Sequence, residues 1–265
     1  MKTIICYTYY ETASSIYNLD FFIKNEINYR EEIDYILVIN GIKCQVSLPK
    51  LKNVKIIKRE NTGYDFGGHY IALNYIREQN LEYEYFIFMN SGVIGPIIPH
   101  YVSTIHWSKY FINKINNKVK LVGTTIVCLP EYDAGGYGPK VESFFFVTDK
   151  VGLEIIEKEK TVFQIHKDKF SAIVNGEYGL SNCILKNGYS IDCMIKKYQN
   201  IDWTDNKNWN LNNCKHPSRK NSFFENSLIP YELIFHKWYW KSDDVNYDTN
   251  NCNFEIIKQY VDNNC

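Results

Sequence analysis

The feature that most constrains the fold of this chain is a pair of short apolar runs that each stop at polar residues. Residues 34–39 are apolar after Asp34 and lead into Asn40-Gly41, whereas residues 85–89 are apolar throughout and lead into Asn90-Ser91-Gly92. An uninterrupted apolar run of this length is typical of a strand buried on both faces of a parallel sheet. The pattern therefore predicts buried parallel strands whose carboxyl ends carry polar side chains.

Further strands and several helices are predicted along the rest of the chain. The strands are expected at residues 3–8, 54–58, 121–127 and 142–147. A helix capped by Ser14 or Ser15 is expected to run to about Glu26. Other helices are expected at residues 69–76, 150–158, 177–187 and 254–261, and Gly188 follows the third of these as a C-cap. Strands that alternate with helices define an α/β sheet, and this is the fold class that we predict.

Length and composition limit the domain organisation and the partners. The chain has 265 residues, of which 45% are hydrophobic, so it can bury a large core. We expect one domain over residues 1–200 and a C-terminal extension, residues 201–265, that packs on the same domain. Residues 202–224 have no regular period, which predicts a loop or a loosely packed appendage. Lys plus Arg and Asp plus Glu both total 30, so we expect no nucleic-acid partner, and any anion site must be local.

The cysteines and the N-terminus indicate a compartment. The eight cysteines form no CxxC pair and no zinc-like doublet. Five of them lie in or beside apolar runs, where a free cysteine behaves as a small buried hydrophobe: Cys6, Cys44, Cys128, Cys183 and Cys193. The start of the chain turns polar too soon for a signal peptide, and no apolar run approaches the ~20 residues that cross a bilayer. The sequence therefore predicts a cytoplasmic protein without a transmembrane segment.

Residues 59–68, between a predicted strand and a predicted helix, contain the residue types that a phosphorylated ligand requires. Arg59 offers a planar cationic fork, Asn61 and Asp65 offer directional hydrogen bonds, and Gly63 permits backbone conformations that other residues avoid. Loops at the carboxyl ends of strands are where open α/β sheets bind ligands. The alternative is a capped turn, in which Thr62 or Asp65 satisfies free amides of the next helix. The residue types alone leave both interpretations open.

The order of several short motifs adds a resemblance to a known family. Asn40-Gly41, residues 59–68 and residues 88–96 follow one another, and residues 142–145, 177–181 and 230–235 continue the series. Over roughly residues 3 to 238, this order resembles the rhamnan synthesis protein F family of glycosyltransferases. Several motifs in a fixed order are more specific than one.

The resemblance implies a GT-A type fold, with a Rossmann-like, mixed but mostly parallel sheet flanked by helices. It also implies transfer, with inversion, of a sugar from a nucleotide donor to a glycan acceptor. The donor would be a UDP-, GDP- or dTDP-linked sugar, and the family suggests a deoxyhexose such as rhamnose. The ring of Tyr7 would stack on the base, and Asp65 would hydrogen-bond the ribose or the base. The predicted donor pocket comprises Tyr7, Thr8, Asn40, Arg59, Asn61, Gly63, Asp65, Asn90, Ser91 and Lys237.

The end of the fourth strand departs from this family pattern. GT-A enzymes usually hold a divalent ion, Mn or Mg, with an acidic pair at this point, but the chain reads Asn90-Ser91-Gly92. An amide and a hydroxyl bind a hard cation much more weakly than carboxylates do. Three interpretations stay open: other groups bind the metal, cations such as Arg59 or Lys237 neutralise the diphosphate, or the enzyme has lost activity. His236 is the one candidate metal ligand in the late region where such enzymes often place one.

Sugar transfer with inversion also needs a carboxylate that takes the proton of the acceptor hydroxyl. Asp133, Glu142 and Glu177 are the candidates, and the resemblance favours Glu177 first and Asp133 second. Each has a structural alternative, since Asp133 suits a turn and Glu177 suits the start of a helix.

Aromatic residues gather in the C-terminal third, which we predict to be the acceptor side. Two other functional classes compete with a glycosyltransferase. A methyltransferase would require a glycine-rich loop after the first strand, and residues 7–12 contain no glycine. A catalytically silent nucleotide- or glycan-binding domain is the main alternative to a glycosyltransferase, because the acidic pair is missing.

Overall fold

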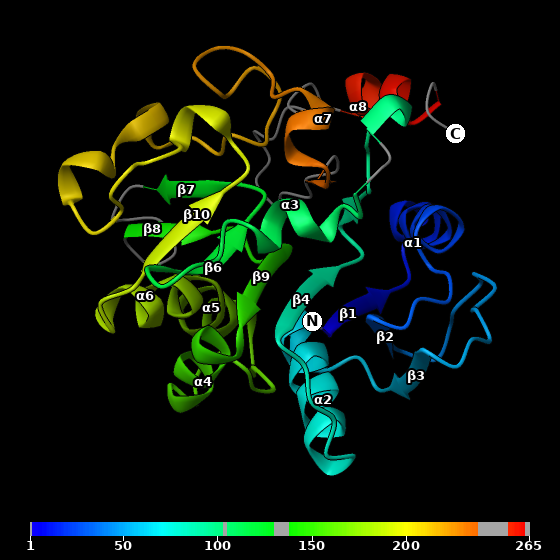
Figure 1. Ribbon diagram of the computed structural model, residues 1–265. Helices are drawn as coiled ribbons and strands as arrows, with labels where there is room; N and C mark the ends of the chain where they lie inside the picture. The colour runs from blue at the N-terminus through cyan, green and yellow to red at the C-terminus, as the bar shows by residue number, and fades with distance from the viewer. Residues whose placement is uncertain (1, 103–104, 130–137, 238–253, 263–265) are drawn as a thin grey trace.

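The centre of the molecule is a seven-stranded sheet with the order β10-β6-β9-β4-β1-β2-β3 (Figure 1). The structure is a computed structural model and describes residues 2–102, 105–129, 138–237 and 254–262. The strands are β1 (Thr3–Tyr10), β2 (Ile33–Asn40), β3 (Val54–Arg59), β4 (Tyr85–Asn90), β6 (Val119–Gly123), β9 (Phe145–Asp149) and β10 (Ser190–Cys193). Neighbouring strands are parallel except that β9 is antiparallel to both β4 and β6. The predicted mixed, mostly parallel sheet is therefore confirmed.

Helices cover both faces of the sheet (Figure 1). One face contacts α2 (Tyr64–Glu78), α4 (Lys150–Lys158) and α6 (Gly179–Lys186), and the other contacts α1 (Ala13–Asn25) and α3 (Ser108–Ile112). Each interface is a separate hydrophobic core. Because side chains alternate along a strand, Ile4 and Cys6 face α2 while Ile5 and Tyr7 face α1. This alternation determines which side chains at the strand ends reach the site.

Two small sheets and several short helical segments complete the fold. β5 (Val93–Ile94) pairs with β11 (His236–Lys237), and β7 (Ile126–Leu129) pairs with β8 (Gly138–Val141), both antiparallel. The short segments are η1 (His100–Val102), α5 (Lys169–Ser171), the π-helical η2 (Ala172–Tyr178), η3 (Lys196–Tyr198), η4 (Asn206–Asn208), η5 (Leu211–Cys214), α7 (Pro230–Leu233) and α8 (Phe254–Asp262).

The described residues 201–237 contribute to the two cores of the sheet, whereas Ile257 and Val261 of α8 pack with Phe21, Ile94 and Ile97 in a third, smaller cluster. Trp203, Leu228 and Leu233 are buried in the core beneath α2, and Phe235 is buried in the core beneath α1. No helix in the described ranges has the length and apolar character of a membrane span. Within those ranges six cysteines are free thiols, of which Cys44 and Cys214 are only partly buried.

Three predicted boundaries were wrong for local reasons. Thr12, not Ser14 or Ser15, caps α1: its hydroxyl accepts from the Ser15 amide at 3.1 Å, and Ser15 Oγ accepts from the Thr12 amide at 2.6 Å. α2 begins at Tyr64, inside the predicted loop, because Gly63 adopts a φ of 73° and acts as its N-cap. The predicted strand at residues 121–127 is divided into β6 and β7.

The helical segment that contains Glu177 also starts earlier than predicted. It begins at Lys169, where Asp168 accepts a hydrogen bond from the Ser171 amide and serves as the N-cap. Glu177 therefore lies in the middle of a continuous helical segment, within the π-helical η2, rather than at a helix start. A role in complementing the helix dipole is excluded by this position.

Candidate functional site

A cleft of about 730 Å³ opens at the carboxyl ends of β1, β2 and β4. Its two sides differ in character, and Asp65 lies between them. We call one side the amide wall; it consists of Thr8, Tyr10, Asn40, Asn61, Asn90 and Ser91. We call the other the charged wall; it consists of Lys140, Glu142, Glu177, His216, Arg219 and Lys237. The cleft lies where ligands bind to open α/β sheets.

The register of the parallel strands builds the amide wall. Thr8 of β1 pairs with Asn90 of β4, and Tyr10 pairs with Asn40 of β2, so the strand ends lie side by side. The Ser91 amide donates to the Thr8 carbonyl at 2.9 Å, which extends this edge beyond β4. Thr8 Oγ1 lies 3.1 Å from Nδ1 of the fully buried His69, whose pKa burial lowers to about 3. The wall therefore presents hydrogen-bonding groups without formal charge.

Asp65, the carboxylate between the walls, is held by an amide. Asn90 Nδ2 donates to Asp65 Oδ2 at 2.9 Å, while Asn90 Oδ1 accepts from the Gly92 amide at 2.9 Å. The other Asp65 oxygen accepts from the Phe66 amide at 3.1 Å. Burial raises the pKa of Asp65 above its ordinary value, although the hydrogen bond from Asn90 acts in the opposite direction.

An ion pair lies in the charged wall. Lys140 Nζ donates to Glu177 Oε2 at 2.6 Å, and the Lys140 side chain is 5% exposed while that of Glu177 is 31% exposed. The ammonium also lies 4.6 Å from the centre of the Tyr178 ring. Burial alone would lower the pKa of Lys140, but the charge of Glu177 outweighs it and the pKa is raised. Lys140 is therefore a buried cation at the edge of the cleft.

Glu142 is a buried carboxylate that joins three segments of the chain. Its Oε2 accepts from Thr125 Oγ1 at 2.5 Å and from Ser218 Oγ at 3.0 Å, and its Oε1 lies 2.9 Å from His216 Nδ1. Burial alone would raise the pKa of Glu142, but the hydrogen bond and charge of His216 and the hydroxyl of Thr125 lower it to about 2. Glu142 is thus held ionised and fixes the segment around His216 against β7 and β8.

Lys237, at the end of β11, adds a second cation to the charged wall. Its ammonium lies 5.8 Å from the centre of the Phe144 ring. Burial lowers the pKa of Lys237 against the attraction of Glu177, Glu142 and Asp65. Three carboxylates and several cations therefore share one cleft, an arrangement suited to an anionic ligand that carries hydroxyl groups.

Several residues predicted for the site lie elsewhere. Tyr7 is 1% exposed and packs on Phe22 with ring centres 5.1 Å apart, on the α1 face of the sheet. The tyrosine in the cleft is Tyr10, which is 51% exposed. His236 is buried, its Nε2 lies 3.0 Å from the Pro230 carbonyl oxygen, and burial lowers its pKa to about 4. Asp133 lies outside the described residues.

Arg59 and Gly63 support the cleft from behind rather than lining it. The Arg59 guanidinium donates to Asn40 Oδ1 at 3.1 Å and to the carbonyl and hydroxyl oxygens of Thr62 at 2.7 and 2.6 Å. It therefore braces the ends of β2 and β3 and the loop that follows. A Cβ on Gly63 would come within 2.7 Å of the Ile165 backbone, so glycine is required there for close packing as well as for its φ of 73°.

The arrangement does not fit the divalent ion that the family resemblance implies. Within the described ranges there is no group of three or more His, Cys, Asp or Glu side chains placed to hold a metal ion. At the end of β4 the amide nitrogen of Asn90 is directed at Asp65, so an N–H donor occupies the place of a second carboxylate. Mg²⁺ and Mn²⁺ prefer oxygen ligands. We therefore derive no step through a metal.

Four residues that line the cleft were not predicted from the sequence: Lys140, His216, Arg219 and Tyr10. For Lys140, in the segment before β9, one signal would have indicated a place in the cleft. The backbone N–H of Asn90 donates to the Phe144 carbonyl oxygen at 3.1 Å, because β9 runs antiparallel to β4 and its first residues meet the end of β4. Recognition of that reversed strand would have put residues 140–144 at the ligand-binding edge. For His216 and Arg219, in an irregular segment, no such pattern exists.

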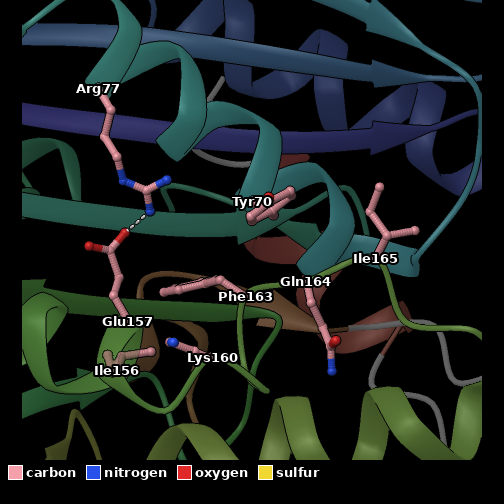
Figure 2. Close-up of a pocket in the computed structure, with 8 residues that line it drawn as sticks. All are labelled: Tyr70, Arg77, Ile156, Glu157, Lys160, Phe163, Gln164 and Ile165. Atoms are coloured by element: carbon pink, nitrogen blue, oxygen red, sulfur yellow. Dashed lines mark hydrogen bonds and ion pairs between the residues drawn. The ribbon is translucent and has the colours of Figure 1, made fainter.

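A second hollow, of about 480 Å³, lies between α2 and the segment after α4 (Figure 2). An ion pair between Arg77 of α2 and Glu157 of α4 crosses it, and Tyr70 and Phe163 lie beside that pair. It contains none of the predicted site residues. Three charged side chains line it, Arg77, Glu157 and Lys160, and the first two neutralise each other in the ion pair.

Comparisons with known proteins give structural similarity only. No protein-family model and no curated protein matches the chain. Among solved structures the chain is similar to A197 from STIV, with 16% identity and a TM-score of 0.36 over 67% of this chain and 80% of that one. It is also similar to residues 1–349 of TarS from S. aureus, with 14% identity and a TM-score of 0.41 over 72% of this chain and 58% of that one.

A third similar structure is the mannosyltransferase PcManGT from Pyrobaculum calidifontis, solved in complex with GDP-Man and Mn²⁺. The identity is 9% and the TM-score 0.39, over 72% of this chain and 54% of that one. The chain thus spans little more than half of the TarS fragment 1–349 and of PcManGT. Because the identities and TM-scores are low, a function for this chain has to be argued from the site itself.

Proposed function

We propose that the protein is a GT-A type glycosyltransferase that moves a sugar from a nucleotide-sugar donor to a glycan acceptor. The proposal is carried by the cleft at the strand ends, which is lined both by uncharged hydrogen-bonding side chains and by buried cations. A nucleotide sugar has the same division, since its nucleoside and sugar are neutral and its diphosphate is anionic. The motif order that resembles the rhamnan synthesis protein F family supports the same function and suggests rhamnose as a donor sugar.

The amide wall would bind the nucleoside. Tyr10 replaces Tyr7 as the proposed platform for the base, because its ring is exposed in the cleft. Asp65, with one oxygen held by Asn90, would accept a hydrogen bond from a ribose hydroxyl. Thr8, Asn40, Asn61 and Ser91 complete this proposed subsite, and Arg59 and Gly63 would act by holding its shape.

The charged wall would bind the diphosphate and carry out the transfer. Lys237 remains a proposed phosphate ligand, since the cleft includes it. Glu177 remains the proposed acceptor of the proton from the attacking hydroxyl. Its Oε2 is bonded to Lys140, so Oε1 is the atom that would take the proton. Attack from the face opposite the diphosphate would invert the configuration at the sugar.

The proposal is tested by binding and hydrolysis of a panel of UDP-, GDP- and dTDP-linked sugars. We expect one nucleotide class to bind with micromolar affinity by calorimetry and one donor to be hydrolysed slowly, with release of the nucleoside diphosphate. Glu177→Gln should lower that turnover by about a hundredfold and leave the dissociation constant of the nucleoside unchanged. No binding of any nucleotide to the wild-type protein would refute the proposal.

A second candidate is a catalytically silent nucleotide- or glycan-binding domain. The amide of Asn90, in the place where metal-dependent GT-A enzymes carry an acidic group, favours it. In the same panel, tight nucleotide binding with no turnover of any donor, with and without manganese, would support the silent domain over the enzyme.

A further inference from the structure

We propose that Lys140 replaces the divalent cation in this cleft and stabilises the diphosphate as it leaves the sugar. This inference rests on the proposed function, because it assigns a role to a residue of the same cleft. It starts from the poor fit between these side chains and a metal ion: the end of β4 presents an amide, while the same cleft is lined by a buried ammonium, that of Lys140.

The position of Lys140 suits this role. It belongs to β8, whose last residue Val141 donates its backbone N–H to Ser181 Oγ of α6 at 2.8 Å. The stem of the lysine is buried and its ammonium is directed to Glu177. An ammonium has three N–H donors, and the bond to Glu177 uses one of them. The charge is therefore fixed in place before a ligand arrives, as a bound metal ion would be.

Besides its proposed role as the base, Glu177 positions Lys140 in this arrangement. It keeps Lys140 charged in a buried place, because a nearby carboxylate compensates for the loss of water around the ammonium. The π-helical η2 places Glu177 on the side of the helix that faces β8. Irregular helical turns of this kind often occur at functional sites. The ion pair therefore acts as a unit, in which Lys140 contacts the diphosphate and the other carboxylate oxygen of Glu177, Oε1, stays available to the acceptor hydroxyl.

In the proposed sugar transfer, groups of the chain account for every charge and proton without a metal ion. The bond between the anomeric carbon and the terminal phosphate oxygen breaks, and the electron pair stays on that oxygen, where the N–H groups of Lys140 stabilise it. The acceptor oxygen forms the new bond to the anomeric carbon. Its proton passes to Glu177 Oε1 and then to solvent. The products are the glycosylated acceptor and the nucleoside diphosphate.

The chain contains a matched control for Lys140. Lys120 is also a mostly buried lysine, 9% exposed, and donates to Asp149 at the same distance, 2.6 Å. It too lies beside a tyrosine ring, that of Tyr189, at 5.9 Å. The residues that line the cleft do not include it. Replacement of either lysine removes a buried cation from an ion pair, but only Lys140 can contact the diphosphate.

The experiment compares Lys140→Gln with Lys120→Gln in EDTA. Calorimetry would measure binding of the preferred nucleoside diphosphate and of the corresponding nucleoside. Because a hydrogen bond to a charged group contributes about 1.5–3 kcal/mol, Lys140→Gln should weaken diphosphate binding by about tenfold to a hundredfold. Nucleoside binding should not change in either variant, and Lys120→Gln should bind the diphosphate as the wild type does. Lys140→Arg, which keeps the charge, should retain most of the affinity.

A second measurement needs no variant. Wild-type donor hydrolysis should be the same within about twofold in EDTA and in manganese, because the required cation belongs to the chain. Loss of turnover in EDTA with recovery in manganese would overturn the inference, as would equal diphosphate binding by the two Gln variants. Either result would leave the proposed glycosyltransferase function standing, whereas failure of the wild type to bind any nucleotide would overturn that function itself.

Discussion

The two walls of the cleft differ in how the chain builds them. The amide wall consists mainly of strand ends, and its residues are aligned by the register of β1, β2 and β4. The charged wall combines β8, η2, the segment around residues 216–219 and β11, which are far apart in the sequence. Backbone hydrogen bonds hold the first wall, and side-chain pairs hold the second. The first wall is therefore robust to substitution of its side chains, whereas the second depends on a few of them.

Glu142 is the contact on which the charged wall most depends, so its removal should have the largest effect. Glu142→Ala leaves Thr125, Ser218 and His216 without their shared acceptor. Loss of one partner from a buried charged network typically costs about 3–5 kcal/mol, and we expect a fall of this size in the free energy of unfolding. Urea denaturation measures it. Nucleotide binding should weaken as well, because His216 and Arg219 lose their support.

A second buried glutamate provides the control. Glu26 accepts from the Tyr35 hydroxyl at 2.8 Å and lies 2.7 Å from His106 Nε2, away from the cleft. Glu26→Ala should destabilise the fold to a similar degree and leave the nucleotide affinity of the folded protein unchanged. If both variants weaken nucleotide binding equally, the contrast between the walls is wrong.

Glu142 also makes the stability of the protein depend on pH. The pKa of Glu142 falls from 4.5 to about 2 on folding, so its contribution is complete above pH 4.5 and is lost as the pH falls to about 2. A shift of this size corresponds to about 3 kcal/mol. Stability measured between pH 6 and 2 should therefore fall more steeply in the wild type than in Glu142→Gln, which cannot titrate. Parallel curves would show that Glu142 is not held ionised.

The difference in how the two walls are built also explains which of their residues the sequence could predict. The apolar runs that stop at Asn40 and Asn90 predicted the amide wall, because burial on both faces leaves a readable pattern and parallel register aligns the ends. The prediction that Tyr7 lines the donor pocket was wrong because Tyr7 points to the other face of β1. Side chains alternate along β1, so Thr8 and Tyr10 share the cleft face while Tyr7 packs beneath α1.

The charged wall left no comparable pattern. Lys140 precedes the strand predicted at residues 142–147 and Glu177 was predicted at a helix start, and nothing local indicates that they meet. Their contact depends on the reversed direction of β9, on the β7–β8 pair and on the helix that begins at Lys169. These are long-range features of packing. Residues whose function depends on such contacts are therefore the ones that local sequence patterns miss.

One substitution would add a formal negative charge to the amide wall. Asn90→Asp places a second carboxylate within about 3 Å of Asp65 Oδ2, where the amide now donates. Repulsion between the two should lower the free energy of unfolding by about 2 kcal/mol at neutral pH. Mn²⁺ should restore it, because the pair then resembles a metal site. Thermal denaturation in EDTA and in manganese measures both effects.

The matched variant is Asn61→Asp, which adds the same charge to an exposed part of the same wall. It should change neither stability nor the response to manganese by a measurable amount. A wild-type protein that manganese stabilises as strongly as it stabilises Asn90→Asp would mean that this wall already holds a metal.

The smallest expected effect concerns the proposed base platform on the amide wall. Tyr10→Ala removes a ring that is 51% exposed, so the free energy of unfolding should hardly change. Loss of stacking on the base should cost about 1 kcal/mol, which is about a fivefold rise in the nucleotide dissociation constant. Tyr7→Leu serves as the opposite case: it disturbs the core beneath α1 and should lower stability without changing the nucleotide affinity. Should Tyr7→Leu weaken binding while Tyr10→Ala does not, the base would lie on the other face of β1, and the amide wall would have to be redrawn from residues of that face.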